Sequence, residues 1–318
     1  MVMMPSLPPP ATGFQLRQTA EAVYIHADDM GATPAVSTRL CDAWENGLLD
    51  GFSVFGDCDH PETLATRLAA HPEHPARISA HLNLWEGRPL LPATEVPRLV
   101  DRSGYFNIEF LDVLRRRHER ERRALLAEVE REWRAQIERV SEMIRPRRLT
   151  GLDGHLHMHM VPPLFRLAVK LAGDYEILEI RNVREPFYLS RSSPDIRSKR
   201  FFVNCAKRTI LSWFGRTNAV VAATAGLTSP DRILGVLYSG LMSRANIIPG
   251  INAARQQGAK RIEILVHIGR AEASELGRFN SNRSKASFVM SPARDAEFDE
   301  LMRLRRGTAA NWSDRQAS

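Results

Sequence analysis

Short apolar runs alternate with amphipathic helical patterns through most of this 318-residue chain, and this alternation constrains its fold more than any other feature. The runs typical of buried strands cover residues 22–29, 52–55, 77–85, 148–160, 176–183 and 261–269. Helical patterns cover residues 33–47, 62–71, 109–145, 162–172 and 230–257. Repeated β-then-α units predict a parallel sheet or barrel with its functional groups at the carboxyl ends of the strands. We find no internal repeat and no clear linker, so one domain is expected.

Polar residues with metal-binding or acid–base chemistry gather at those strand ends. They are Asp28, Asp29, His81, His155, His157, His159 and His267. A metal site needs about three nitrogen or oxygen ligands that converge from different elements. One Asp with histidines from two other strands would leave positions open for water, which is the pattern of metal-dependent hydrolases.

The run His155-Leu-His-Met-His159 is the most specific of these signals. In an extended segment its three histidines would share one face, which is costly to bury unless they serve a ligand or a partner. Less specific explanations exist for the other residues. His81 alone would usually be a hydrogen-bonded structural histidine, and Asp28-Asp29 could form a turn and helix cap before Gly31.

Four motifs in order resemble the YdjC-like carbohydrate deacetylases, a family that includes chitooligosaccharide and hopanoid-associated deacetylases. The motifs are ADDMG (27–31), HLNLWEGRP (81–89), LDGHLHMHMVP (152–162) and EILVHIG (263–269), and Gln136 lies in the preceding helix as expected. The resemblance covers roughly residues 22–270. It implies a distorted (β/α) barrel, a divalent metal ion, and hydrolysis of an N-acetyl group on a sugar.

The resemblance also implies residue roles. Asp29, His81 and His155 match the family's metal ligands, Asp28 its general base, and His267 the histidine that acts on the leaving amine. Two positions depart from the family pattern. His26 stands where Asn is frequent, and His267-Ile-Gly replaces His-Pro-Gly, so the backbone after His267 is less constrained than in the family pattern.

Five further residues are candidates for binding substrate. His157 and His159 could contact the sugar or orient the ligands, or they could hold the loop. Trp85 and Glu86 could line a sugar subsite, although Trp85 could also belong to the core. Arg181 could contact an anionic or hydroxyl group, although a salt bridge is the commoner fate of such a residue.

The expected function is therefore metal-dependent removal of an N-acetyl group from an amino sugar, which is free, oligomeric, or linked to a lipid or phosphate. Either Mg²⁺ or Zn²⁺ suits an Asp-His-His site. Two alternatives remain: another metal-dependent amidase or phosphoesterase on the same barrel, and a membrane-associated binding protein with a degenerate site. No nucleic-acid-binding motif is visible, and relatives suggest a homodimer.

The net charge of +7 is concentrated in residues 191–216, where seven Lys or Arg residues face a single Asp. Aromatic residues in the same segment, including Phe202 and Trp213, give the mixture expected of a helix on an anionic membrane. The alternative is a segment that packs its aromatic residues on the barrel or on a second subunit. We expect residues 186–225 to form an insertion in a barrel spanning 21–305.

The ends of the chain and its cysteines complete the prediction. Residues 1–20 are a proline-rich segment expected to be a disordered arm, and residues 306–318 a disordered polar tail. The N-terminus does not resemble a signal peptide, and no window is apolar enough to span a membrane. Three cysteines without a C-x-x-C pair favour the cytoplasm, with a peripheral position at the inner membrane face as an option.

Overall fold

A seven-stranded parallel sheet organises the computed structural model, which describes residues 22–115, 118–190, 198–279 and 283–308. Its strands are β1 (Ala22–Met30), β2 (Gly51–Val54), β3 (Arg77–Leu82), β4 (Gly151–Gly154), β5 (Glu179–Ile180), β6 (Arg232–Leu234) and β7 (Arg261–Val266). The strand order is β5-β4-β3-β2-β1-β7-β6, and every neighbouring pair is parallel. Because β1 lies near the middle, its polar end is flanked by groups from several strands.

The two edges of this sheet approach each other. Thr228 donates its N–H to the carbonyl of Leu178 at 2.9 Å and accepts from Ile180 at 3.0 Å, and Ile233 donates to the carbonyl of Arg184 at 3.4 Å. These few hydrogen bonds link the β5 edge to the β6 edge without a regular ladder. The prediction of a distorted (β/α) barrel is therefore confirmed.

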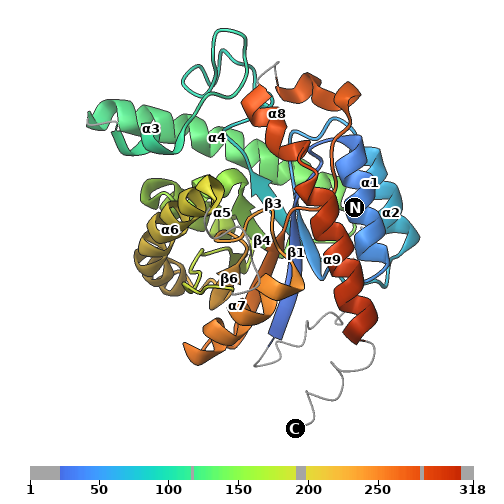
Figure 1. Ribbon diagram of the computed structural model, residues 1–318. Helices are drawn as coiled ribbons and strands as arrows, with labels where there is room; N and C mark the ends of the chain where they lie inside the picture. Colours follow the sequence, from blue (N-terminus) through green and yellow to red (C-terminus); the bar gives the residue numbers. More distant parts are fainter. Residues whose placement is uncertain (1–21, 116–117, 191–197, 280–282, 309–318) are drawn as a thin grey trace, which may run out of the picture.

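Helices surround the barrel and cover its carboxyl end (Figure 1). The outer helices are α1 (Pro34–Glu45), α2 (Pro61–Ala70), α4 (Glu119–Met143), α5 (Pro162–Asp174), α6 (Lys199–Thr224), α7 (Arg244–Gln256) and α9 (Ala293–Thr308). Shorter elements are α3 (Phe110–Arg115), the 3₁₀ segments η1 (His155–Met160) and η3 (Ala273–Phe279), and α8 (Arg283–Val289). In the view of Figure 1, α3 and α8 lie toward the upper end of the molecule.

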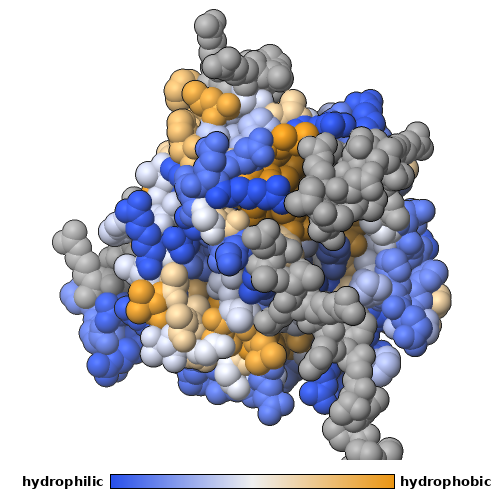
Figure 2. All heavy atoms as spheres, turned by 90° about the horizontal axis from the view of Figure 1, so that it is seen from below, coloured by the Kyte–Doolittle hydropathy of each residue, from blue (hydrophilic) through white to orange (hydrophobic). Residues whose placement is uncertain are grey.

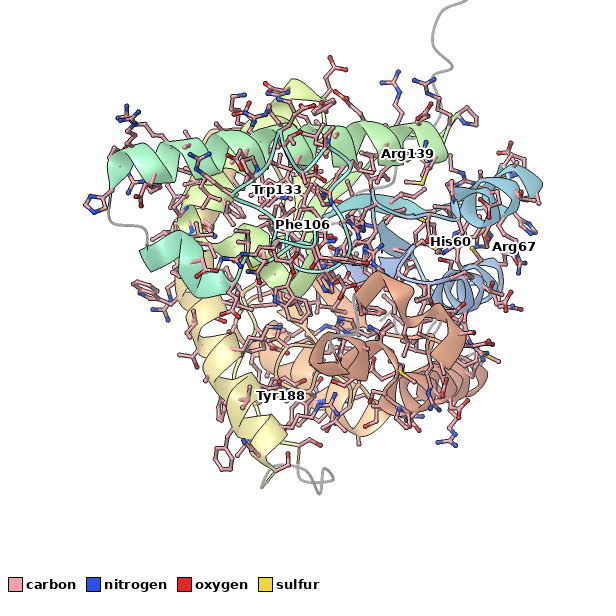
Figure 3. The ribbon with its side chains drawn as sticks, turned by 90° about the horizontal axis from the view of Figure 1, so that it is seen from above. His60, Arg67, Phe106, Trp133, Arg139 and Tyr188 are labelled. Atoms are coloured by element: carbon pink, nitrogen blue, oxygen red, sulfur yellow. The ribbon has the colours of Figure 1, made fainter. Side chains whose placement is uncertain are left out.

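Apolar spacing explains why the outer helices pack on the sheet. In α4 the buried residues include Leu125, Val129, Trp133 and Val140, which follow one another at intervals of four, four and seven positions and form one face. Figure 3, seen from above, shows Trp133 and Phe106 directed toward the middle of the molecule, and both are at most 1% exposed. Burial of these apolar faces positions the strand ends that carry the polar groups.

Three sequence predictions about local structure are wrong. The histidine run does not continue β4 as an extended segment, because Leu156 and His157 have φ values of 53° and 61° and the chain turns into η1. The segment 109–145 is divided into α3 and α4, and residues 230–257 contain strand β6 as well as helix α7. β6 is only three residues long, so its pattern is too short to stand out beside a helix.

The predicted insertion contains a single long helix, α6, which lies between β5 and β6 in the sequence and packs against α5 and η1. Residues 191–197 lie outside the described residues, as do the predicted N-terminal arm and residues 309–318 of the predicted tail. Helix α9 continues to Thr308, into the segment predicted as tail. Within the described ranges, no helix is long and apolar enough to cross a bilayer.

Hydrophobic residues on the face seen from below are scattered among hydrophilic ones (Figure 2). Large exposed apolar side chains of the described residues are most frequent on α6, where Phe202, Val203, Ile210, Trp213 and Val220 are 47–66% exposed. The opposite side of α6 buries Phe201, Leu211 and Phe214 against the body of the protein. Aromatic residues of this segment therefore divide between the core and the solvent.

Candidate active site

The end of β1 bends so that two consecutive carboxylates enter the same buried region. Consecutive side chains of a regular strand point to opposite faces. The pairing of β1 with β2 is irregular between Ala27 and Met30, and Asp29 has a φ of 74°, a conformation rare outside glycine. Asp28 and Asp29 are each 3% exposed, and they contact different partners.

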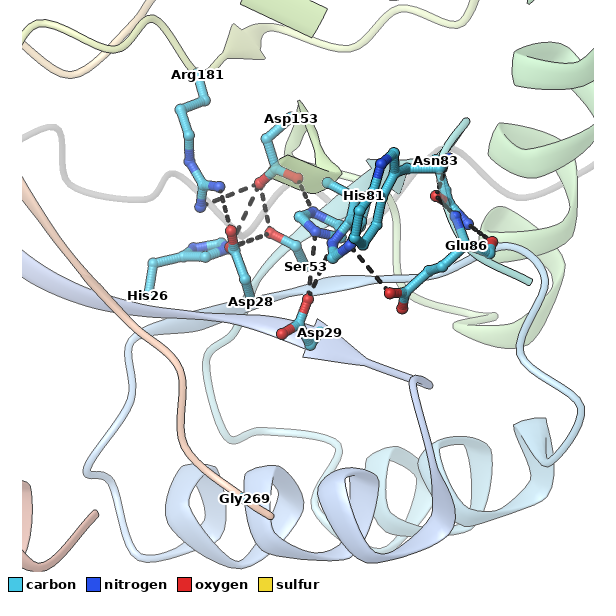
Figure 4. A network of polar contacts seen from close by, with 12 residues as sticks. His26, Asp28, Asp29, Ser53, His81, Asn83, Glu86, Asp153, Arg181 and Gly269 are labelled. Atoms are coloured by element: carbon cyan, nitrogen blue, oxygen red, sulfur yellow. Dashed lines mark hydrogen bonds and ion pairs between the residues drawn. The ribbon is translucent and has the colours of Figure 1, made fainter. Parts of the chain in front are cut away.

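Asp29 lies beside His81, the penultimate residue of β3 (Figure 4), and beside His155, which directly follows β4. Its Oδ1 is 3.7 Å from Nε2 of His81 and 3.3 Å from Nδ1 of His155. One ligand atom from each of these three buried residues lies within 4.8 Å of the other two. The structure thus brings together the three residues that the sequence predicts as metal ligands.

Each of these two histidines contacts a carboxylate through the ring nitrogen that does not face Asp29. Nδ1 of His81 hydrogen bonds Oδ1 of Asp153 at 2.6 Å, which leaves Nε2 facing Asp29. Oε2 of Glu86 lies 3.3 Å from Nε2 of His155. Burial opposes the charged form of His155, but Glu86 and Asp29 outweigh it and raise its pKa to about 9. Metal binding at His155 would therefore have to displace a proton.

Unsatisfied buried atoms provide a test of whether these residues fit a metal ion. Oδ1 of Asp29 and Nε2 of His81 are buried and have no hydrogen-bond partner among the described residues. Buried polar atoms without partners are rare and costly. One carboxylate oxygen and two imidazoles also form a donor set that divalent ions accept. The three residues therefore fit a divalent metal ion.

Asp28 belongs to a second network, centred on Arg181. Nη1 of Arg181 donates to Oδ2 of Asp28 at 2.9 Å, and Nη2 lies 3.2 Å from Oδ2 of Asp153. Ser53 Oγ is 3.2 Å from Oδ1 of Asp28 and 2.7 Å from Nε2 of His26. Burial raises the pKa of Asp28, but Arg181 and His81 outweigh it and the net pKa is lowered. Asp28 is therefore ionised near neutrality and can accept a proton.

His267 lies at the end of β7, where its backbone N–H donates to Oε2 of Glu297 at 2.8 Å. Its Nδ1 is buried without a hydrogen-bond partner in the described part of the chain. Burial lowers the pKa of His267 to about 4, despite the nearby carboxylates of Asp28 and Asp29. The imidazole is therefore neutral near pH 7 and must receive a proton before it can donate one.

The other predicted residues surround this centre in different ways. Trp85 is half-buried, with its ring centroid 6.1 Å from that of His155. His159 is fully buried, and its Nε2 hydrogen bonds the carbonyl of Arg181 at 2.9 Å. That position favours a role in holding η1 over contact with substrate. His157 is 5% exposed, and burial together with Lys207 and Arg181 lowers its pKa well below the usual value.

Several residues of this region are not found by sequence reasoning. Asp153 and Ser53 are central to the second network, and Glu263 extends it. Arg294 of α9 binds Oδ2 of Asp29, 265 positions away in sequence. Asp153 could have been predicted from the sequence, because it lies two residues before His155 at a strand end. A buried Arg or Ser contact across the barrel has no sequence signal of its own.

The model of the YdjC-like protein family matches residues 22–305, which include the whole barrel and the site. The chain belongs to the YdjC-like family. The predicted family membership is thus confirmed, and the match extends past the four motifs to include most of α9.

Relatives of this YdjC-like protein carry deacetylase names. A carbohydrate deacetylase of Geobacillus stearothermophilus is 32% identical over 161 residues, which cover 50% of this chain and 59% of the relative. A chitooligosaccharide deacetylase of Yersinia pestis is 28% identical over 162 residues, covering 47% of this chain and 55% of the relative. The matched part thus spans little more than half the length of these relatives.

One solved structure supports the fold. A protein from Enterococcus faecalis V583, named for cellobiose-phosphate cleavage, superposes with a TM-score of 0.57 and 22% identity. The superposition covers 88% of this chain and 94% of the other. At this identity the likeness supports the shared architecture and not a shared reaction.

Proposed function

We propose that this protein is a metal-dependent hydrolase that removes the N-acetyl group from an amino sugar. The observation that carries the proposal is the convergence of unsatisfied atoms of Asp29 and His81 with His155, beside the ionised carboxylate of Asp28. The deacetylase names of the relatives point to the same reaction.

Asp29, His81 and His155 would hold the metal ion. The chemistry that a divalent ion supplies in such a site is acidification of water and polarisation of a carbonyl group. Asp153 and Glu86 fix the orientation of the two histidines from their other ring nitrogens, as carboxylates commonly do behind metal-binding histidines. The burial of the group excludes competing solvent and strengthens its electrostatic effects.

Asp28 and His267 would carry the protons of the reaction. Asp28 accepts a proton as the oxygen of water forms a bond to the acetyl carbon, and Arg181 keeps the carboxylate oriented. The amide C–N bond then breaks, and the nitrogen must gain a proton to leave as an amine. The imidazole of His267 starts neutral, so it would deliver that proton after taking up the equivalent of the one that water gave to Asp28. The products are acetate and the free amino sugar.

An acetate-release assay tests this function. Wild-type protein with added Zn²⁺ or Mg²⁺ is given free, oligomeric and lipid-linked N-acetyl sugars, and phosphate release is measured alongside. We expect acetate from at least one sugar, and a loss of at least about 100-fold in Asp28→Asn and His155→Ala. His118→Ala, an exposed histidine beside α4, is the matched control. Full acetate release by both site variants would contradict the assignment, and phosphate release would favour a phosphoesterase.

We also propose that the sugar substrate carries an anionic group, and Lys207 supports this. Lys207 lies on α6 between the buried residues Asn204 and Leu211, so it shares their inward face. Burial lowers its pKa, while Asp28 and Asp29 raise it. No hydrogen bond or ion pair of its ammonium group occurs with the other described residues. A cation beside the site that has no partner among the described residues suits a phosphate or carboxylate substituent on the sugar.

The outward face of α6 supports the proposed association with an anionic membrane. Phe202, Trp213 and Val220 are 64–66% exposed there, and residues 199–224 contain five basic and no acidic residues. Exposed aromatic groups beside basic side chains suit the surface of an anionic bilayer.

Vesicle binding tests this association. We expect the double variant Phe202→Ser/Trp213→Ser to bind vesicles of anionic lipid more weakly than wild type, and zwitterionic vesicles to bind neither protein. Phe201, Leu211 and Phe214 stay intact because they are part of the core. Unchanged vesicle binding would refute the membrane role. A wild-type dimer that the double variant converts to a monomer would assign this face to a second copy instead.

A further inference from the structure

Helix α9 brings two buried charged side chains to the site from the far end of the chain. Arg294 is 1% exposed and Glu297 is 2% exposed, and their spacing of three places them on the same helix face. Buried charges are unfavourable unless they are paired and hydrogen-bonded. The residues that pair with Arg294 and Glu297 therefore indicate the role of these two charges.

Every nitrogen of the Arg294 guanidinium has an acceptor. Nη2 binds Oδ2 of Asp29, Nη1 donates to the carbonyl of Gly269 at 3.2 Å, and Nε donates to the carbonyl of Phe288 at 3.2 Å. The guanidinium also lies over the Phe288 ring, 4.7 Å from its centroid. A planar group held at these points cannot rotate, so it fixes the carboxylate that it binds.

The two oxygens of Asp29 consequently have different surroundings. Oδ2 is occupied by Arg294, whereas Oδ1 faces His81 and His155 and lacks a hydrogen-bond partner in the described part of the chain. A carboxylate free of such a contact could turn to bring both oxygens to a metal ion. With Arg294 in place, only Oδ1 is available.

Glu297 acts on the other side of the site. Its Oε2 accepts from the backbone N–H of His267 at 2.8 Å, and its Oε1 accepts from Met242 at 3.1 Å. The His267 ring packs edge-on against Phe288, with centroids 5.1 Å apart, and the same Phe288 ring lies under Arg294. One turn of α9 therefore contacts both the predicted metal ligand and the predicted proton donor.

We propose that Arg294 is a positioning residue that restricts Asp29 to single-oxygen binding of the metal, and that Glu297 positions His267. The inference rests on the metal assignment proposed above. It makes the C-terminal helix part of the site, although neither residue contacts a reacting atom.

Metal affinity of Arg294→Lys tests the first part, because this change keeps the charge and removes the rigid planar contact. We expect the Zn²⁺ dissociation constant, measured by competition with a chromophoric chelator, to rise about 10- to 100-fold. With Co²⁺ as the probe, the visible bands should weaken as the freed Oδ2 raises the coordination number. Arg303→Lys, an exposed arginine on the same helix, should change neither quantity.

Phe288→Leu gives a milder variant should Arg294→Lys not fold, and we expect a smaller rise in the same dissociation constant. Glu297→Gln should keep Zn²⁺ affinity while it lowers kcat for acetate release more than it changes KM. A folded Arg294→Lys protein with wild-type Zn²⁺ affinity and Co²⁺ spectrum would overturn the inference alone. A wild-type protein that binds neither ion would instead overturn the proposed metal site.

Discussion

Two groups of three residues at the end of β1 have the composition of a metal site, and they differ in what already satisfies them. The first is Asp29, His81 and His155, and the second is His26, Asp28 and Asp153. All six residues are at most 5% exposed. The first group retains unpartnered atoms within the described structure, whereas the second is linked by Ser53 and neutralised by Arg181.

Residue composition alone therefore does not define a metal site in this protein. In the second group a guanidinium supplies the positive charge that the carboxylates need, so an ion would have to displace it. Burial opposes the ionised form of Asp153, but Arg181 and His81 lower its pKa well below the usual value. Under the proposed function, the two adjacent aspartates of β1 would have different roles: Asp29 would bind the ion and Asp28 would accept a proton.

Substitution of each aspartate in turn tests this division directly. Asp29→Ala should abolish stoichiometric Zn²⁺ binding, whereas Asp28→Asn should keep it, and both should lose acetate release. Titration calorimetry measures the stoichiometry and affinity of each variant. The two groups would lose their distinction if Asp28→Asn bound no Zn²⁺ or if Asp29→Ala bound it as tightly as wild type.

A second experiment removes the cation that separates the groups. Arg181→Met leaves Asp28, Asp153 and Glu263 without their shared partner, and uncompensated buried charge of this kind costs about 3–5 kcal/mol. We expect the free energy of unfolding, measured with urea, to fall by about that amount at pH 7. Arg303→Met is the exposed control. A loss no larger than in the control would mean that Arg181 does not hold the second group together.

The contrast also shows how far sequence reasoning extends. The sequence predicts that four residues lie together, because a parallel sheet brings its strand ends together whichever residues lie between them. These residues are Asp28, Asp29, His81 and His155. The sequence does not predict the η1 turn, because alternating histidines suit an extended strand. The positive φ values of Leu156 and His157 depend on tertiary packing. Contacts such as Arg181–Asp28, 153 positions apart, depend on helix and loop placement that has no local pattern.

Glu263 is the carboxyl group near Arg181 that is expected to keep a proton to the highest pH, which reduces the negative charge of this region. Burial, with Asp153 and Asp28 nearby, raises its pKa to about 7 despite contact with Arg181. Since this folded-state pKa exceeds the unfolded value of 4.5, the stabilising contribution is complete below about pH 4.5. It is lost as pH rises through about 7, at a cost of about 3 kcal/mol.

Glu263→Gln removes this titration while it keeps an oxygen for Arg181. We expect the free energy of unfolding of the variant, relative to wild type, to increase between pH 5 and pH 8. Glu300→Gln, a partly exposed glutamate paired with Arg303, is the control. Parallel pH profiles for wild type and Glu263→Gln would show that Glu263 does not titrate with a raised pKa.

The smallest change in activity is expected for Lys207, whose charge lies near both Asp28 and Asp29. Loss of one charge-assisted hydrogen bond is worth about 1.5–3 kcal/mol, so Lys207→Met should raise KM for a phosphate-bearing N-acetyl sugar about 10-fold or more. KM for a neutral chitooligosaccharide should change little, because no anion then needs the ammonium group. Lys199→Met, exposed at the start of α6, is the matched control. An equal rise for charged and neutral sugars would mean that Lys207 acts on Asp28 and Asp29 instead of on the substrate.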